Sequence, residues 1–139
     1  LASKVVAVEG HQLLDGGIAD SIPLRFFEQQ GYDKNVVVLT QPKGYVKKPN
    51  PLMPLIRLQL HRYPKFLKAA AERHIMYNEE TEYVAQQEKE GKAFVIRPHS
   101  ILPINHITHD PELMQKVYED GRSVMLSRLT ELMSFLSES

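Results

Sequence analysis

A carboxylate followed by two glycines is the feature of this sequence that most suggests chemistry. Asp15, Gly16 and Gly17 stand in the stretch LLDGGIADSIPL, between a short apolar run and a segment that favours a helix. Asp-Gly is a common turn dipeptide, because glycine accepts positive φ and aspartate bonds its own backbone. A carboxylate between a strand and a helix N-terminus also stands where α/β proteins place reactive groups, and it can act as a general base. The residues alone leave both interpretations open.

Other groups that could do chemistry have simpler structural explanations. Asp20 lies near the expected start of a helix, where capping or an interaction with the helix dipole explains it. His106, His109 and Asp110 could contribute to a zinc site, but no third ligand stands at a recognisable spacing. Surface or capping roles are therefore favoured for these histidines. None of the serines lies in a G-x-S-x-G sequence, so the chain shows no nucleophile elbow.

Length, charge and cysteine content narrow the class of protein. A chain of 139 residues suits one domain, which would bury about two-thirds of its unfolded surface. The 17 Lys and Arg residues balance 17 Asp and Glu residues, so no nucleic-acid partner is expected. The lack of cysteine excludes a disulfide framework and a zinc-thiolate site. No apolar run approaches the ~20 residues that span a bilayer, and no signal peptide is recognised, so a cytoplasmic location is expected.

Short runs of β-branched residues predict the strands. Residues 4–8 (KVVAV) and 11–14 (HQLL) flank a glycine turn and indicate two short strands. The nearly continuous apolar run at 35–40 (NVVVLT) is typical of a parallel strand that helices cover on both faces. The run at 92–98 (KAFVIRP) predicts a further buried strand, which its proline ends.

Capping residues and apolar spacing predict the helices before the last strand. Ser21 is expected to cap a first helix that holds Pro23 in its first turn and stops at Gly31. A loop rich in proline and lysine, QPKGYVKKPNPLMP, should follow the 35–40 strand, before a short helix at 52–61. A long helix is then predicted from Lys65 to about Glu90. Its expected apolar positions are Leu67, Ala71 and Ile75.

The C-terminal part of the chain is predicted to be helical. Asp110 should cap a helix with Pro111 at its first position, and this helix should run to about Asp120. Gly121 is expected to kink or end it, and an amphipathic helix should follow to the C-terminus. The order of strands and helices indicates an α/β layered domain.

Three longer stretches carry a resemblance to a known family. LLDGGIADSIPLRFFEQQGYDKNVVVLTQPKGYVKKP, YPKFLKAAAERHIMYN and EKEGKAFVIRP together resemble the C-terminal half of bacterial patatin-like phospholipases over most of the chain. Members of that family are serine acyl hydrolases with a Ser-Asp dyad on a three-layer α/β/α fold with a mostly parallel sheet. Their nucleophile lies in a G-x-S-x-G elbow and their aspartate in a D-G-[GA] motif. That motif matches Asp15, Gly16 and Gly17.

The resemblance implies a function and an organisation for the chain. Asp15 would be the acidic member of the dyad, and Gly16 and Gly17 would shape its turn. The elbow serine and the Gly-rich oxyanion loop are absent, so the chain is expected to be the C-terminal segment of an acyl hydrolase domain. Residues 1–98 would end the α/β core, and 99–139 would form a C-terminal helical part. The implied partners are a lipid or acyl-ester substrate and the N-terminal half of the same protein, with no cofactor or metal.

Other functions remain open. The main alternative is a non-catalytic patatin-like binding or scaffolding domain. A second is a nucleotide or phosphate binder that uses the Gly-Gly turn as an anion site, although the acid before the glycines and the lack of G-x-G-x-x-G count against it. Lys43, Lys47 and Lys48 around Tyr45 could contact anionic head groups, at about 1 kcal/mol for each cation, although a solvated loop is favoured. A peripheral membrane contact therefore stays open beside the cytoplasmic location.

Overall fold

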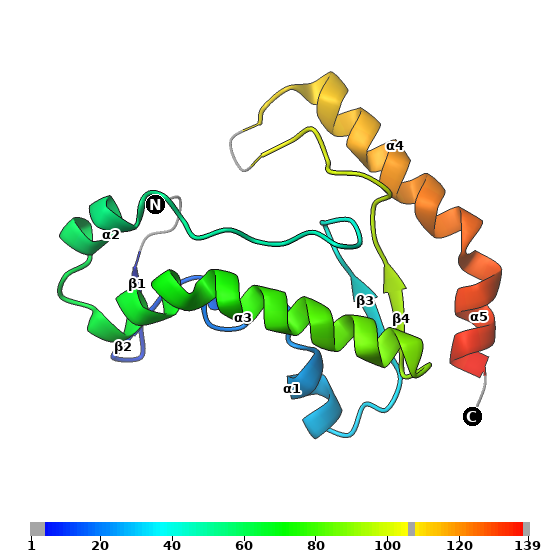
Figure 1. Ribbon diagram of the computed structural model, residues 1–139, viewed down its shortest axis with the longest axis horizontal. Coiled ribbons are helices and arrows are strands. Elements are labelled where there is room, and N and C mark those ends of the chain that lie inside the picture. Colours follow the sequence, from blue (N-terminus) through cyan, green and yellow to red (C-terminus); the bar gives the residue numbers. More distant parts are fainter. Residues whose placement is uncertain (1–4, 106–107, 138–139) are drawn as a thin grey trace. The chain divides into compact units, whose positions relative to one another are not determined.

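The computed structural model describes residues 5–105 and 108–137 and shows a mixed α/β protein in which helices predominate (Figure 1). The order of elements agrees with the order predicted from the sequence, except for the 3₁₀ helix η1, which was not predicted. In chain order they are β1 (Val6–Val8), β2 (His11–Leu13), the 3₁₀ helix η1 (Gly16–Ile18), α1 (Leu24–Gln29), β3 (Asn35–Val38), α2 (Met53–Gln59), α3 (Pro64–Lys89), β4 (Ala93–Ile96), α4 (Pro111–Ser127) and α5 (Leu129–Ser137).

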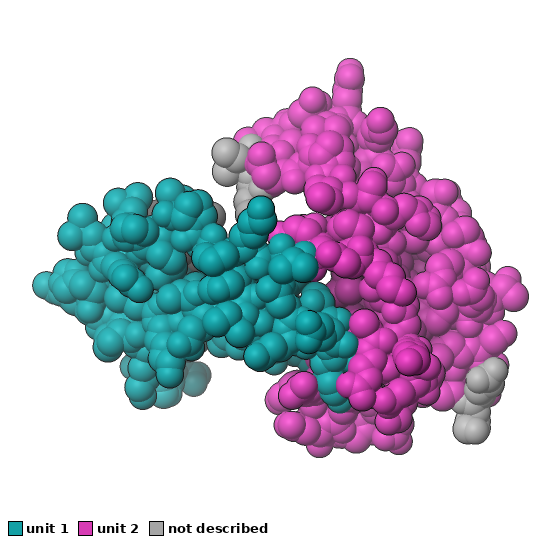
Figure 2. All heavy atoms as spheres, in the orientation of Figure 1, with its two compact units in different colours: residues 1–23, 46–83 teal, residues 24–45, 84–139 magenta. Residues whose placement is uncertain are grey.

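The chain divides into two compact units (Figure 2). Unit 1 consists of Leu1–Pro23 and Val46–Tyr83, and unit 2 of Leu24–Tyr45 and Val84–Ser139. The long helix α3 contributes residues to both units. The Asp15 turn therefore belongs to unit 1, and the parallel strands β3 and β4 belong to unit 2.

A β-hairpin begins the described part of unit 1. Strands β1 and β2 pair antiparallel, with Val6 opposite Leu13. The two residues between them, Glu9 and Gly10, both have positive φ, 49° and 81°, as a two-residue type I′ hairpin turn requires. The predicted pair of short strands around a glycine turn is confirmed. Lys4, which the sequence predicts in the first strand, lies outside the described residues.

Helix α3 begins at Pro64, where the missing N–H of proline removes no helical hydrogen bond. The predicted long helix is confirmed, but its predicted apolar stripe is only partly covered: Leu67 and Ala71 are half-buried. Ile75 is 50% exposed, whereas the buried residues of α3 are Val84 and Gln87 near its C-terminal end. The buried positions of α3 are thus set by the elements that pack against it. The regular spacing of apolar residues in the sequence does not identify these positions.

The sheet of unit 2 has two parallel strands. β3 pairs with β4 in the register that places Val37 opposite Val95. β4 is buried almost throughout, while in β3 only Val37 is buried and Val36 and Val38 are exposed. The predicted cover on both faces of this strand is therefore not present among the described residues. The core of unit 2 contains Leu24, Val37, Val84, Ala93, Phe94 and Val95.

Helix α1 starts later than predicted. It begins at Leu24, which is buried, and α1 contacts β3. Ser21 is not its cap, because the Ser21 hydroxyl donates to the carbonyl of Gly17 instead. Gly31 follows the helix with a φ of 90°, so the predicted glycine stop is confirmed.

The N-terminus of α4 is capped as predicted. The Asp110 carboxylate accepts hydrogen bonds from the backbone N–H groups of Glu112 and Leu113, at 3.0 and 3.3 Å, with Pro111 at the first helical position. The predicted end of this helix is wrong, because α4 continues through Gly121 to Ser127. A glycine inside a helix weakens it by only about 1 kcal/mol, which the flanking turns tolerate.

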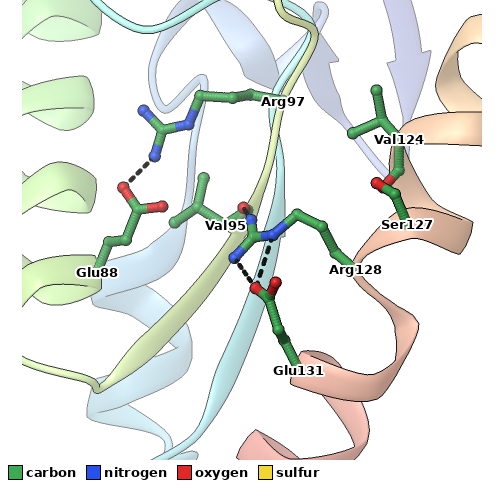
Figure 3. A network of polar contacts seen from close by, with 7 residues as sticks. All are labelled: Glu88, Val95, Arg97, Val124, Ser127, Arg128 and Glu131. Carbon is green, nitrogen blue, oxygen red and sulfur yellow. Dashed lines mark hydrogen bonds and ion pairs between the residues drawn. The ribbon is translucent and has the colours of Figure 1, made fainter.

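The break between α4 and α5 lies at Arg128, whose side chain has several partners in unit 2 (Figure 3). Its guanidinium donates to the backbone carbonyl of Val95 and to the Glu131 carboxylate. It also lies 4.3 Å from the centre of the Phe94 ring. These contacts connect the helical C-terminal part to β4. No helix in the described part of the chain is long and apolar enough to cross a membrane.

Candidate functional site

Asp15 lies between β2 and η1 and caps the short helix. Its Oδ1 atom accepts a hydrogen bond from the Gly17 N–H at 2.9 Å, and its carbonyl accepts from the Ile18 N–H at 3.2 Å. The side chain is exposed. Among residues 5–105 and 108–137, no group hydrogen-bonds to Oδ2. One carboxylate oxygen is therefore fixed by the turn, and the other is accessible to a further donor.

The two glycines of the turn differ in what they allow. Neither has the positive φ that is typical of glycine in an Asp-Gly turn. A Cβ on Gly17 would lie 3.3 Å from Asp15 Oδ1 and 3.9 Å from Arg73 Nη2, whereas a Cβ on Gly16 would meet nothing within 4 Å. A side chain at Gly17 would therefore require the Asp15 carboxylate to shift by a few tenths of an ångström, and the structure gives no comparable reason for glycine at Gly16.

The carbonyl of Gly17 accepts two side-chain hydrogen bonds. Arg73 of α3 donates through Nε at 2.9 Å, and the Ser21 hydroxyl donates at 2.6 Å. Because the amide of the same glycine donates to Asp15, both polar backbone groups of Gly17 have partners. The orientation of this residue is thus determined partly by the turn and partly by α3.

Glu80 of α3 binds the backbone that follows the turn. Its Oε1 accepts from the Ser21 N–H at 3.3 Å, and its Oε2 accepts from the Ile22 N–H at 3.0 Å. Burial raises the pKa of Glu80, and the nearby Asp20 carboxyl raises it further, whereas the two amides counteract part of this. Asp20 thus lies beside Glu80, and its expected role as a cap of α1 is not among its described interactions.

Lys47 lies on the segment between β3 and α2 and belongs to unit 1. The amide side chain of Asn78 binds both backbone groups of Lys47, and the Lys47 ammonium lies 4.8 Å from the centre of the Tyr77 ring. Burial lowers the pKa of Lys47, and the positive charge of Arg73 adds to this. The predicted solvated loop is therefore correct for the other two lysines of KGYVKKP, which are exposed, but not for Lys47.

The hydrogen bonds of the turn and the positions of the acidic and histidine side chains bear on the possible phosphate and metal sites. The Gly17 N–H, which an anion at the Gly-Gly turn would use, already donates to the carboxylate of Asp15. A phosphate there would meet a negative charge, so the structure disfavours a phosphate site. Within the described ranges, no group of three or more His, Cys, Asp or Glu side chains could hold a metal ion. His106 lies outside the described residues.

The residues of α3 that bind the turn and the Lys47 segment are not among those that the sequence predicts for the site. Arg73, Asn78 and Glu80 stand in the stretch AERHIMYNEE, which the sequence identifies only as part of a long helix. Arg73 and Glu80 are seven residues apart and so lie on the same face of α3. A polar pair at that spacing, on a helix expected to pack against a sheet, is the signal that could have identified them.

The fold and the turn define a mixed α/β protein with an accessible, capping carboxylate in unit 1 and a two-stranded parallel sheet in unit 2. The chain belongs to the family described as Domain of unknown function (DUF6363), which matches residues 63–137. The matched region contains Arg73, Asn78 and Glu80, and it does not reach Asp15. No curated protein and no solved structure matches the chain.

Proposed function

We propose that this chain supplies Asp15 as the acidic member of a Ser-Asp dyad in a patatin-like serine acyl hydrolase with a three-layer α/β/α fold. The observation that carries the proposal is the state of the Asp15 carboxylate. Oδ1 is held by the Gly17 N–H at 2.9 Å, and Oδ2 has no hydrogen-bond partner in the described part of the chain. A serine hydroxyl that donates to Oδ2 would meet a carboxylate whose orientation is already restricted.

The proposed reaction is hydrolysis of a lipid or another acyl ester. The serine Oγ attacks the ester carbonyl carbon while its proton moves to the Asp15 carboxylate. The tetrahedral intermediate collapses, the C–O bond to the alcohol breaks, and the alcohol leaves with that proton. Water, deprotonated by the same carboxylate, then attacks the carbonyl carbon of the acyl-serine. The bond between the acyl carbon and the serine Oγ breaks, the proton returns from Asp15 to Oγ, and the carboxylic acid leaves. The proposal requires no cofactor or metal.

The proposal places the serine in the N-terminal half of the same protein. Among the described residues, no serine hydroxyl hydrogen-bonds to Asp15, and the Ser21 hydroxyl donates to the Gly17 carbonyl. The chain also contains no G-x-S-x-G elbow and no Gly-rich oxyanion loop. Both would have to come from that N-terminal half.

The parallel sheet of unit 2 supports such a partner segment. The N–H groups of Asn35 and Leu39 donate to carbonyls at the two ends of β4, so the polar backbone groups of Val36 and Val38 point away from β4. Val38 is 68% exposed. Parallel sheets are normally covered on both faces and extended by further strands. An open edge with exposed valines is what we expect where strands from the N-terminal half would join.

We propose that the protein is located in the cytoplasm and binds membranes peripherally. Helices α4 and α5 expose several large apolar side chains that could rest on a lipid surface that contains the substrate. These side chains are Met114, Tyr118, Leu126, Leu129, Met133 and Leu136. Binding of the intact protein to phospholipid vesicles, measured by sedimentation, tests this part of the proposal.

Substitution of the proposed base tests the catalytic assignment. Asp15→Asn keeps the size of the side chain and the cap on Gly17 but removes the base, so we expect it to lower kcat for a p-nitrophenyl ester by about 100-fold or more in the intact protein. Asp33→Asn, at an exposed carboxylate of unit 2, is the matched control and should leave kcat unchanged. Near-normal turnover of a folded Asp15→Asn protein would contradict the assignment.

Covalent labelling separates the hydrolase from a scaffolding domain. A fluorophosphonate reacts with an activated serine, so we expect it to label the intact protein and not the 139-residue chain. Labelling of the chain alone would show that it holds its own nucleophile. An intact protein that remains unlabelled and inactive would favour the non-catalytic binding domain.

A further inference from the structure

The backbone that follows Asp15 is attached to α3 at two points. Arg73 Nε donates to the Gly17 carbonyl at 2.9 Å, close to the carboxylate. Glu80 accepts from the Ser21 and Ile22 amides at 3.3 and 3.0 Å, at the far end of the same segment. All of these residues belong to unit 1, so the arrangement is internal to one compact body.

The spacing of the two side chains matches the segment that they bind. Arg73 and Glu80 are seven residues apart on one face of α3, which separates them by about 10 Å along the helix axis. A single attachment would leave the segment free to rotate about the contact. Two attachments on a rigid helix determine both its position and its direction.

We propose that Arg73 and Glu80 are positioning residues for the Asp15 carboxylate, an inference that rests on the proposed function of Asp15. Gly17 is the link. Its carbonyl is held by Arg73, and its amide holds Oδ1 of Asp15. By fixing Gly17 and the residues after it, α3 determines where the accessible Oδ2 atom points. The DUF6363 match would then cover the residues that orient the base, although not the base.

Glu80 is suited to this role because it is a carboxylate. Two oxygens accept from two neighbouring amides, and charge-assisted hydrogen bonds of this kind are stronger than neutral ones. A glutamine has an NH₂ group in place of one of the two oxygens, so Glu80→Gln replaces the acceptor that faces one of the two amides by a donor. The substitution keeps the size of the side chain and removes only its charge and one acceptor.

The charged groups around Glu80 allow Glu80→Gln to distinguish a positioning role from simple repulsion by a neighbouring carboxylate. Asp20 lies beside Glu80, and Lys47 lies beside Arg73. If Glu80 were only a carboxylate repelled by Asp20, Glu80→Gln would remove the repulsion and hold the segment at least as firmly as before. If Glu80 positions the segment, the loss of an acceptor loosens the Ser21 or Ile22 amide even though the repulsion is relieved. The two explanations therefore predict opposite changes.

Amide hydrogen exchange of residues 17–22 in the intact protein measures the attachment directly. We expect Glu80→Gln to increase exchange at Ser21 and Ile22 by about tenfold, and Arg73→Met to increase exchange across the turn by a similar factor. The control is Glu79→Gln, which changes the neighbouring exposed carboxylate of α3 and should leave exchange unchanged. Unchanged or slower exchange in both test variants would overturn the inference, whether or not the protein hydrolyses esters.

Ester turnover by the same variants measures the positioning. We expect Glu80→Gln and Arg73→Met to lower kcat by about tenfold with little change in KM, because they misplace the base without touching the substrate. Faster exchange with normal kcat would show a purely structural attachment and overturn the inference. Normal turnover by Asp15→Asn would instead overturn the proposed function of Asp15. The positioning role of Arg73 and Glu80 would then fail as well, but the exchange data would still show whether the two side chains attach the segment to α3.

Discussion

Asn78 of α3 binds both backbone groups of Lys47 with the two ends of its amide. Its Oδ1 accepts from the Lys47 N–H at 2.8 Å, and its Nδ2 donates to the Lys47 carbonyl at 3.1 Å. The segment around Lys47 has no regular secondary structure, so it has no strand partner for these groups. The Asn78 side chain satisfies them as a neighbouring strand would. It thereby holds the proline-rich segment against α3 within unit 1.

Removal of this amide should destabilise the protein. We expect Asn78→Leu to lower the free energy of unfolding by about 1–3 kcal/mol, because two half-buried backbone groups lose their partner. Urea denaturation followed by circular dichroism measures the change. Glu79→Leu, at the adjacent exposed position, should alter it by no more than about 0.5 kcal/mol. Equal effects of the two substitutions would show that the Asn78 contacts contribute nothing specific.

The two glycines of the turn should respond differently to a methyl group. In Gly17→Ala the new Cβ would lie 3.3 Å from Asp15 Oδ1, so the carboxylate must shift. We expect kcat for ester hydrolysis by the intact protein to fall by about tenfold. Gly16→Ala meets nothing within 4 Å, so it should leave kcat unchanged and raise the free energy of unfolding by about 0.4–1 kcal/mol. The opposite ranking would contradict the geometry of the turn.

Glu80 should make the stability of the protein depend on pH. Burial and the Asp20 carboxyl raise its pKa above 4.5, so the folded chain binds this proton more tightly than the unfolded chain. The contribution of Glu80 to stability is therefore greatest below pH 4.5 and falls as the pH rises through its folded pKa. In urea denaturation we expect the advantage of the wild type over Glu80→Gln to shrink as the pH rises above 4.5 through the folded pKa of Glu80.

A further variant makes this pH prediction specific. The Asp20 charge is one of the causes that raise the Glu80 pKa, so Asp20→Asn should reduce the pH dependence without abolishing it. A wild-type advantage over Glu80→Gln that grows with pH would show that the pKa is lowered and would refute the prediction.

Arg128 should matter more to stability than its acidic partner. Arg128→Met leaves the Val95 carbonyl, on the side of β4 away from β3, without its donor, and we expect a loss of about 1–3 kcal/mol. Glu131→Gln removes only a largely exposed ion pair, so it should lower the free energy of unfolding by less than about 1 kcal/mol. Thermal unfolding of the two variants gives the comparison. If Glu131→Gln is the more harmful change, the ion pair rather than the carbonyl contact holds α5.

The elements that could be predicted depend on neighbours in the sequence. Asp110 caps α4 because its carboxylate reaches amides two and three residues ahead, and Gly31 follows α1 because its backbone accepts positive φ. The valine-rich and KAFVI runs form the parallel strands because β-branched and aromatic residues favour extended backbone. These preferences act over a few residues, so a single sequence shows them.

The failed predictions depend on distant partners. Ser21 does not cap α1, because the Gly17 carbonyl takes its hydroxyl. The last helices are interrupted at Arg128, whose side chain reaches the Val95 carbonyl, rather than at Gly121. Ile75 fits an apolar stripe and is exposed because no other element covers it in the described structure. Local patterns do not contain this information.

The site shows the same division between local and tertiary causes. That Asp15 bonds its own turn follows from the sequence, because the carboxylate and the Gly17 amide are two residues apart. That Arg73, 56 residues from Gly17, and Glu80, 59 residues from Ser21, hold this turn is a property of the tertiary structure. At such separations a side chain can choose among many donors and acceptors, and only folding brings one helix face within hydrogen-bonding distance of the turn.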